Sequence, residues 1–144
     1  MKYTQLGNTD LHVSRICFGC WQLSPSFWGE IALEPWQQSV HAAIDHGVNF
    51  LDTAEMYPVN PVSADTLGGT EEVIGAWNAK GGREKLVIAT KVSGEGSGVM
   101  VGGTPMIDAA RLRSGVEASL IRLQTDRIDI YQMHWPNRGS YHFR

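Results

Sequence analysis

Short apolar segments alternate with amphipathic segments along the chain, and this alternation constrains the fold more than any other feature. Residues 16–19, 48–51, 86–90 and 128–133 form largely apolar runs that predict β-strands, and apolar residues recur at helical spacing between them. A strand–helix–strand recurrence of roughly 30 to 45 residues is the βαβ pattern, whose strands must be parallel. The sequence therefore predicts an α/β fold with a parallel sheet.

Three helices are predicted between these strands, and a β-hairpin before them. Pro35 stands near the start of the first helix, where a missing N–H costs nothing, and Gly47 ends this helix. The second helix ends at Gly81-Gly82, and the initial segment predicts a hairpin that turns at Gly7. The apolar faces of the three helices consist of Trp36, Val40, Ala43 and Ile44, then Val73, Ile74 and Trp77, then Leu112, Val116, Leu120 and Leu123.

Two architectures fit this pattern: a doubly wound sheet and a (β/α)8 TIM barrel. The doubly wound dinucleotide fold has G-x-G-x-x-G directly after its first strand, where this chain has Gly19-Cys20-Trp21-Gln22. The glycine-rich stretch 93–103 matches neither that motif nor a P-loop, and it predicts a surface loop. The (β/α)8 barrel is therefore the predicted fold. Residues 1–144 are interpreted as one domain, with a hairpin over 1–15, βα units 1 to 4 over 16–136 and a tail over 137–144.

The composition excludes several classes of protein. The chain has 144 residues, of which 42% are hydrophobic and 19% are charged, values typical of a globular domain. A net charge of −3 gives no basic surface for nucleic acid. No run approaches the ~18 apolar residues of a membrane span, and the first residues lack the apolar core of a signal peptide. We therefore expect a cytoplasmic protein without a nucleic-acid or membrane partner.

The two cysteines, Cys17 and Cys20, have the C-x-x-C spacing of a redox dithiol or of half a zinc site. In a strand, however, residues three apart point to opposite faces and lie about 10 Å from each other. That separation is too large for a disulfide, and no second cysteine pair completes a zinc site. A structural role for both cysteines, with no metal, is the prediction.

Three polar residues share one position relative to the predicted strands. Asp52, Lys91 and His134 each end a strand on its C-terminal side, and Tyr57 follows Asp52 by one short loop. In a barrel these strand ends form a single face, where barrel enzymes carry their catalytic residues. A single histidine or lysine at a strand end is usually only a solvated polar group. Four such groups on one face indicate a catalytic site.

The four residue types suit the reduction of a carbonyl group. Hydride transfer creates an alkoxide that needs a proton, and a free tyrosine, with a pKa of about 10, is a weak acid at neutral pH. The ammonium of Lys91 is expected to lower the pKa of Tyr57, and Asp52 to balance the charge of Lys91. A neutral His134 can donate a hydrogen bond to the carbonyl oxygen.

The segments that carry these residues resemble the aldo-keto reductases, especially the bacterial members related to the potassium-channel β subunits. The similar segments are residues 6–14, 18–21, 49–57, 88–92, 119–123 and 126–136. The resemblance implies an NADPH-dependent oxidoreductase that reduces aldehydes or ketones to alcohols. Its catalytic tetrad would be Asp52, Tyr57, Lys91 and His134, with Tyr57 as proton donor.

The resemblance also implies where cofactor and substrate bind. NADPH would lie extended across the mouth of the barrel, with Cys20, Trp21 and Asp52 against the nicotinamide ribose. Trp21 and Trp135 are predicted to line the substrate pocket. Cys20 stands where a threonine is common in the family, and the loop 58–69 is long. The identity of the small carbonyl substrate is therefore not carried over.

The resemblance covers only the N-terminal half of such a barrel, because four strands are predicted and a complete barrel has about 250 residues. The family's main cofactor clamp follows its seventh and eighth strands. Three interpretations stay open: a piece of a working reductase, two copies that together complete a barrel, or a cofactor-sensing regulatory protein like the channel β subunits. The open edges of the first and fourth strands also predict self-association.

Overall fold

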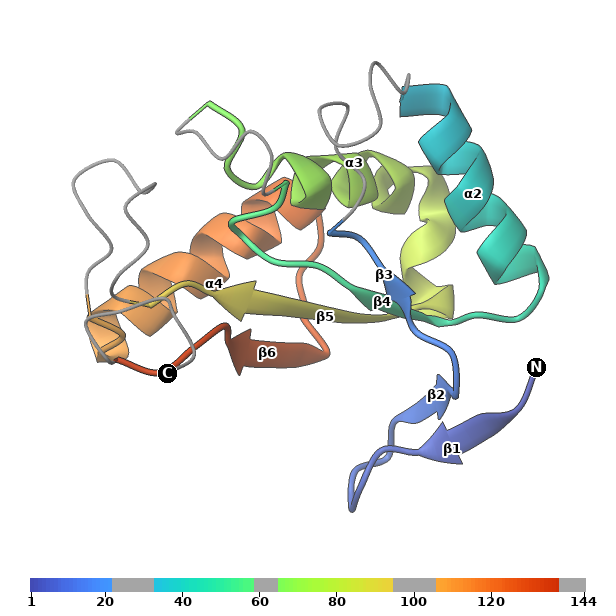
Figure 1. Ribbon diagram of the computed structural model, residues 1–144, viewed down its shortest axis with the longest axis horizontal. Helices are drawn as coiled ribbons and strands as arrows, with labels where there is room; N and C mark the ends of the chain where they lie inside the picture. Colours follow the sequence, from blue (N-terminus) through green and yellow to red (C-terminus); the bar gives the residue numbers. More distant parts are fainter. Residues whose placement is uncertain (22–32, 59–64, 95–105, 138–144) are drawn as a thin grey trace.

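A hairpin and a parallel sheet form the framework of the chain (Figure 1). The computed structural model describes residues 1–21, 33–58, 65–94 and 106–137. Strands β1 and β2 pair antiparallel, as the sequence predicts, and four further strands form a parallel sheet in the order β3-β4-β5-β6. The strands are β1 (Tyr3–Gln5), β2 (His12–Ser14), β3 (Phe18–Gly19), β4 (Phe50–Asp52), β5 (Val87–Val92) and β6 (Ile130–Met133).

The strand order favours the barrel over the doubly wound sheet. Each strand lies beside the strand that precedes it in the sequence, whereas a doubly wound sheet reverses direction after its first strands. Figure 1 shows the three α-helices on one face of this sheet, which is the arrangement of helices outside a strand layer. These helices are α2 (Leu33–Asp45), α3 (Gly69–Trp77) and α4 (Ala109–Leu123).

Local interactions explain where the best-defined helix begins and ends. The side chain of Asp108 caps α4 by accepting a hydrogen bond from the backbone N–H of Arg111 at 2.7 Å. At the other end, Gln124 adopts a left-handed conformation with φ of 48°, and its N–H donates to the carbonyl of Ile121. The predicted third helix is thus confirmed, and these two contacts explain its boundaries.

The end of the second predicted helix differs from the prediction. Helix α3 ends at Trp77, and a π-helical turn, η1 (Asn78–Gly82), and a 3-10 turn, η2 (Arg83–Lys85), follow it. The side chain of Asn78 donates a hydrogen bond of 2.7 Å to the carbonyl of Leu123. Gly81 has a φ of 90°, which a residue with a side chain rarely adopts. The contact of Asn78 with Leu123, the last residue of α4, accompanies the widened turn.

The main hydrophobic core lies between the sheet and the helices. A close approach of α3 to the end of α4 depends on Gly75, where an added Cβ would lie 2.0 Å from the carbonyl oxygen of Arg122. Burial of the apolar side chains in this core is the main favourable contribution to folding. The core consists of Cys20, Val40, Leu51, Ile74, Leu86, Ile88 and Leu123.

The bounds of all four strands in the parallel sheet differ from the sequence prediction, and the second runs over Phe50–Asp52 in place of 48–51. The first strand of the parallel sheet begins at Phe18, because β3 pairs only with β4 and only over two residues, and Ile16 is 60% exposed. The fourth begins at Ile130, two residues after its predicted start. Strand β5 continues to Val92, so Lys91 lies inside the strand and not after it.

Some predictions concern residues outside the described ranges. Most of the glycine-rich stretch 93–103, half of the loop 58–69 and nearly all of the tail 137–144 belong to them. Within the described ranges, every helix is too short or too polar to span a membrane.

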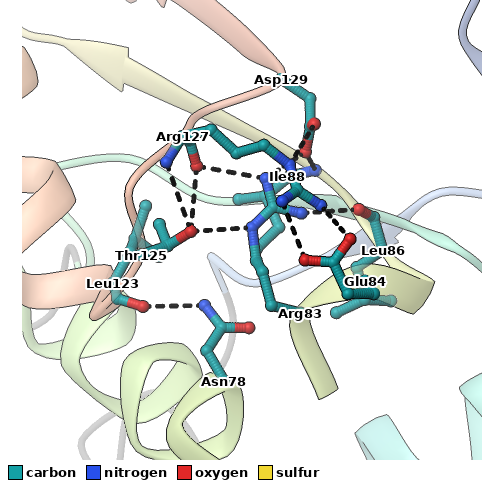
Figure 2. A network of polar contacts seen from close by, with 9 residues as sticks. All are labelled: Asn78, Arg83, Glu84, Leu86, Ile88, Leu123, Thr125, Arg127 and Asp129. Atoms are coloured by element: carbon teal, nitrogen blue, oxygen red, sulfur yellow. Dashed lines mark hydrogen bonds and ion pairs between the residues drawn. The ribbon is translucent and has the colours of Figure 1, made fainter. Parts of the chain in front are cut away.

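The N-terminal end of β5 is held by a polar network around Arg83 (Figure 2). The guanidinium of Arg83 donates to Asp129 Oδ2 at 2.6 Å, and the same oxygen accepts the backbone N–H of Ile88 at 2.8 Å. The side chains of Arg83 and Asp129 are only 8% and 12% exposed. The other acceptors of Arg83 are the carbonyls of Leu86 and Arg127 and the hydroxyl of Thr125.

Candidate active site

The predicted ion pair between Lys91 and Asp52 is present at the C-terminal ends of two neighbouring strands. Asp52 is the last residue of β4, and Lys91 is the penultimate residue of β5. The ammonium of Lys91 donates to Asp52 Oδ2 at 2.7 Å and to the carbonyl oxygen of Thr53 at 2.7 Å. The lysine side chain is 13% exposed and the aspartate side chain 32%. A largely buried cation is therefore balanced by a partly exposed carboxylate.

Tyr57 lies in the loop that follows β4, with its ring against Lys91. The Lys91 ammonium is 5.1 Å from the centre of the Tyr57 ring. A turn closed by a hydrogen bond from the N–H of Tyr57 to the carbonyl of Ala54 places the ring there. Tyr57 is 8% exposed and packs in a second apolar cluster with Ala54, Met56 and Trp135.

His134 completes the group from the neighbouring strand. It follows β6 directly, and its backbone N–H donates to the carbonyl of Val92 at 2.9 Å. The imidazole meets the ring of Tyr57 edge-on, with centres 5.6 Å apart, and it lies 5.0 Å from the Trp135 ring. Within the described ranges, the buried Nδ1 atom of His134 has no hydrogen-bond partner. The structure thus brings the four predicted residues together.

The histidine is uncharged at neutral pH. Burial lowers the pKa of His134 to about 4, and the positive charge of Lys91 acts in the same direction. This state agrees with the predicted neutral imidazole, which donates a hydrogen bond from one ring nitrogen.

The expected lowering of the tyrosine pKa by Lys91 is wrong for this structure. Burial raises the pKa of Tyr57 to about 12, and the negative charge of Asp52 adds to the rise. The carboxylate of Asp52 lies 2.7 Å from the Lys91 ammonium, so it offsets much of the positive potential at the phenol. The loss of solvation then dominates. Tyr57 is therefore fully protonated at neutral pH.

The two cysteines lie in different environments, and only Cys20 is part of the core. Both are free thiols; Cys17 is exposed, and Cys20 is fully buried in the main core. Burial raises the pKa of the Cys20 thiol, which disfavours the reactive thiolate. The backbone N–H of Cys20 donates to the carbonyl of Asp52 at 2.8 Å. Because the whole residue is 0% exposed, the predicted contact of Cys20 with a cofactor is not available in this structure.

The two tryptophans predicted for the substrate pocket lie in different environments. Trp21 follows β3 and is 43% exposed, whereas Trp135 is 5% exposed and packs beside His134 and Tyr57. In the part of the chain that the structure describes, no group of histidine, cysteine and carboxylate side chains is arranged to hold a metal ion.

A second ion pair beside the tetrad was not predicted from the sequence. Glu55 is 5% exposed, and its Oε1 atom accepts the backbone N–H of Ser93 at 2.5 Å and a hydrogen bond from Arg111. The position of Glu55 between Asp52 and Tyr57 in the sequence indicated that it lies near the tetrad. Its partners were not visible, because they are 38 and 56 residues away.

The buried carboxylate of Glu71 joins helices α3 and α4 to β5. Glu71 is fully buried. One of its oxygens accepts a hydrogen bond from the hydroxyl of Thr90 and the other accepts one from Arg122 Nε, both at 2.6 Å. Because Thr90 precedes Lys91, this network fixes β5 directly next to the tetrad lysine.

The residues present fit one end of a nicotinamide cofactor better than the other. Asp52 offers a carboxylate that is one-third exposed, and Trp21 offers an exposed indole. The two buried cations near the tetrad, Lys91 and Arg111, are each paired with a carboxylate. The described residues around the tetrad therefore suit a ribose and a nicotinamide ring, and they leave no unpaired buried cation for the phosphates.

Comparison with known proteins identifies the family. A model of the aldo/keto reductase family matches residues 15–141. The chain belongs to the aldo/keto reductase family. It is 40% identical to protein tas of Escherichia coli (strain K12) over an alignment of 147 residues. This alignment covers 97% of this chain and 40% of that protein. It is 32% identical to the probable voltage-gated potassium channel subunit beta of Arabidopsis thaliana, over 97% of this chain and 39% of that protein.

Solved structures of aldo-keto reductases have the same fold over nearly the whole chain. The holo form of AKR11C1 from Bacillus halodurans is 34% identical with a TM-score of 0.73, over 92% of this chain and 40% of that one. The predicted family and the predicted (β/α)8 barrel are confirmed, and β3 to β6 are four consecutive strands of such a barrel. The chain spans about two-fifths of the length of the curated relatives that it matches.

Proposed function

We propose that this aldo/keto reductase chain supplies the catalytic residues of an NADPH-dependent oxidoreductase that reduces an aldehyde or ketone to an alcohol. The observation that carries the proposal is the convergence of Tyr57 and His134 on the Lys91–Asp52 ion pair. The tyrosine ring lies 5.1 Å from the Lys91 ammonium and 5.6 Å from the imidazole. Family membership supports the same chemistry.

Each residue has a defined task in this proposal. NADPH supplies a hydride to the carbonyl carbon. Tyr57, whose phenol is protonated at neutral pH, donates its phenolic proton to the oxygen on which negative charge develops. Lys91 stabilises the phenolate that remains, and Asp52 keeps the lysine charged and in place. The neutral imidazole of His134 donates a hydrogen bond to the same oxygen.

The cofactor would be held only in part by these residues. Asp52 and Trp21 would contact the nicotinamide ribose, as the family resemblance implies. Phosphate contacts would come from other parts of a complete barrel. We therefore expect the 144-residue chain by itself to bind NADPH at least about a hundredfold more weakly than a full-length relative, because two or three charge-assisted hydrogen bonds are missing.

A second candidate function is regulatory. The 32% identity to a probable channel β subunit favours a protein that binds the cofactor and signals its presence, with little turnover. Cofactor binding without cofactor consumption would distinguish this function from that of a reductase.

The experiment that tests the proposal uses an exchange protein, in which this chain replaces the matching part of E. coli protein tas. NADPH consumption is followed by absorbance with a panel of small aldehydes and ketones, and NADPH binding by fluorescence. We expect consumption that depends on the carbonyl compound. Tight binding without consumption with every compound would instead support the regulatory function.

A further inference from the structure

Glu55 lies at the centre of the tight turn that ends in Tyr57. The hydrogen bond from the N–H of Tyr57 to the carbonyl of Ala54, 3.1 Å long, closes this turn. The backbone N–H of Glu55 donates to the carbonyl of Lys91 at 3.2 Å. The turn is therefore joined directly to the strand residue that carries the ammonium. Only one residue separates Glu55 from Tyr57.

The carboxylate of Glu55 takes the place of a backbone acceptor in the sheet. The N–H of Thr53 donates to the carbonyl of Ala89 and that of Glu55 to the carbonyl of Lys91, as in a continuing parallel ladder. In a regular parallel ladder, the backbone N–H of Ser93, the residue after β5, would donate to a backbone carbonyl. Here Ser93 N donates to Glu55 Oε1 at 2.5 Å. The backbone is thereby free to turn toward Tyr57 without leaving a buried N–H unpaired.

The same carboxylate also fixes the turn to a helix. Arg111, in the first turn of α4, donates to Glu55 Oε1 through its Nη2 atom. The side chains of Glu55 and Arg111 are 6% and 11% exposed. Loss of the glutamate would leave a buried guanidinium unpaired and a buried amide without an acceptor, so the turn could not keep its place.

We propose that Glu55 is a positioning residue that holds Tyr57 at its place beside Lys91 and His134, and that it acts through Ser93 N and Arg111. This inference rests on the proposed function, because the position matters for turnover only if Tyr57 donates the proton. Glu55 touches neither the substrate nor the reacting atoms in this proposal. Its effect should therefore concern the rate of the chemical step more than binding.

Asp129 provides a matched control at the other end of β5. Its Oδ2 atom likewise accepts one backbone N–H, that of Ile88, and one arginine, Arg83. The carboxylates of Glu55 and Asp129 are similarly buried, at 6% and 12% exposure. Substitution of either removes the same kind of contacts, but only Glu55 borders the turn that carries Tyr57.

The test compares Glu55→Ala, Glu55→Gln and Asp129→Ala in the exchange protein, below their melting temperatures. A displacement of Tyr57 by about 1 Å should lower kcat about a hundredfold, so we expect that loss for Glu55→Ala with KM changed by less than about threefold. Glu55→Gln keeps an oxygen acceptor for Ser93 N and should recover a large part of kcat. Asp129→Ala should lower the melting temperature and leave kcat within about twofold of the parent.

A second readout separates this inference from the proposed function. The histidine ring signals are recorded by NMR and assigned to His134 with a His134→Gln variant. The edge-on ring of Tyr57 shifts these signals, and Glu55→Ala should move them while Asp129→Ala should not.

If the parent protein shows no turnover, the proposed function fails, and this NMR shift still decides the role of Glu55. Unchanged His134 signals in Glu55→Ala, or equal losses of kcat in Glu55→Ala and Asp129→Ala, would overturn the inference. If Glu55→Ala does not fold, the same comparison is made with Glu55→Gln, where a smaller NMR shift is expected and no shift would contradict it.

Discussion

Both ends of β5 are braced by a carboxylate that accepts one backbone N–H and one arginine, but the surroundings of the two arginines differ. At the N-terminal end, all three guanidinium nitrogens of Arg83 donate to an acceptor (Figure 2). At the C-terminal end, Arg111 Nε, Ser93 Oγ and His134 Nδ1 are buried without a hydrogen-bond partner in the described residues. All side-chain nitrogens of Arg83 are thus paired and one of Arg111 is not, although Asn78 Oδ1, close to the Arg83 network, is also buried without a partner in the described residues.

The difference separates stability from chemistry along a single strand. A buried polar group without a partner costs about 1–3 kcal/mol, and such groups in native structures call for a functional explanation. The large pKa shifts of Tyr57 and His134 also occur at the C-terminal end. In barrel enzymes the C-terminal face carries the catalytic residues and the N-terminal face contributes stability. The proposed function assigns the two ends of β5 to the same division.

The largest expected effect comes from breaking the C-terminal end at Lys91. In the exchange protein, Lys91→Met should lower kcat about a thousandfold, within the range of general acid–base catalysis. Without the ammonium, the charge of Asp52 is uncompensated and should raise the pKa of Tyr57 further, which makes the phenol a weaker acid.

Asp52→Asn should lower kcat less, because the carbonyl of Thr53 still accepts from the Lys91 ammonium. Steady-state kinetics across a range of pH measure both variants. Parent-like kcat and pH profiles in both would show that the pair has no part in the reaction.

The opposite result is expected at the N-terminal end. Arg83→Met removes the partner that lies 2.6 Å from Asp129, which is 12% exposed, and leaves this carboxylate only Arg127 Nε at 3.8 Å. Removal of one member of a buried pair destabilises a protein by about 3–5 kcal/mol, so urea unfolding should show a loss of this order. The kcat should remain within about twofold of the parent. A thousandfold loss of kcat in a folded Arg83→Met protein would abolish the distinction between the two ends.

The strand pattern predicted most of this division, and its limits have physical causes. The rule that parallel strands end on one face placed Asp52, Lys91 and His134 together correctly. Ile16 was assigned to a strand because apolar runs predict strands, although pairing with only one neighbour ends the strand short of it. Periodicity could not show the π-helical turn at Asn78, which accompanies a contact with Leu123, 45 residues away.

The electrostatics of the site were harder to predict than its composition. The pKa of Tyr57 depends on its burial and on the short distance between Asp52 and Lys91, and neither can be predicted from the sequence. Glu55 was missed for a similar reason, because its role follows from Ser93 and Arg111, which approach it only in the folded chain.

A smaller effect is expected from the pH dependence of stability. Folding depresses the pKa of His134 from its ordinary value of 6.5 to about 4, so between these values the unfolded chain binds a proton that the folded chain does not. Stability should therefore fall as the pH falls from about 6.5 to about 4, by on the order of 2–3 kcal/mol from this group. His134→Gln should flatten that part of the curve of unfolding free energy against pH. An identical slope in parent and variant would contradict the burial of a neutral imidazole.

The smallest effect should come from an exposed ion pair near the N-terminal end. Arg127 donates to both oxygens of Glu84 at 2.9 and 2.8 Å, but the side chains are 44% and 77% exposed. Solvent screens such a pair, so Glu84→Gln should leave the melting temperature and kcat unchanged within error. A clear drop in melting temperature would mean that this exposed pair in the network of Figure 2 contributes to stability.

The central claim is that Tyr57 at the C-terminal end donates the proton, and the most direct test is kcat of Tyr57→Phe in the exchange protein. The matched control is Tyr3→Phe, which removes a hydroxyl that donates to the carbonyl of Gly47 at 2.8 Å, far from the tetrad in the sequence. We predict that Tyr57→Phe lowers kcat by about 10²- to 10⁴-fold with nearly unchanged NADPH affinity, while Tyr3→Phe keeps the parent kcat. A Tyr57→Phe protein whose kcat stays within about threefold of the parent would contradict the account.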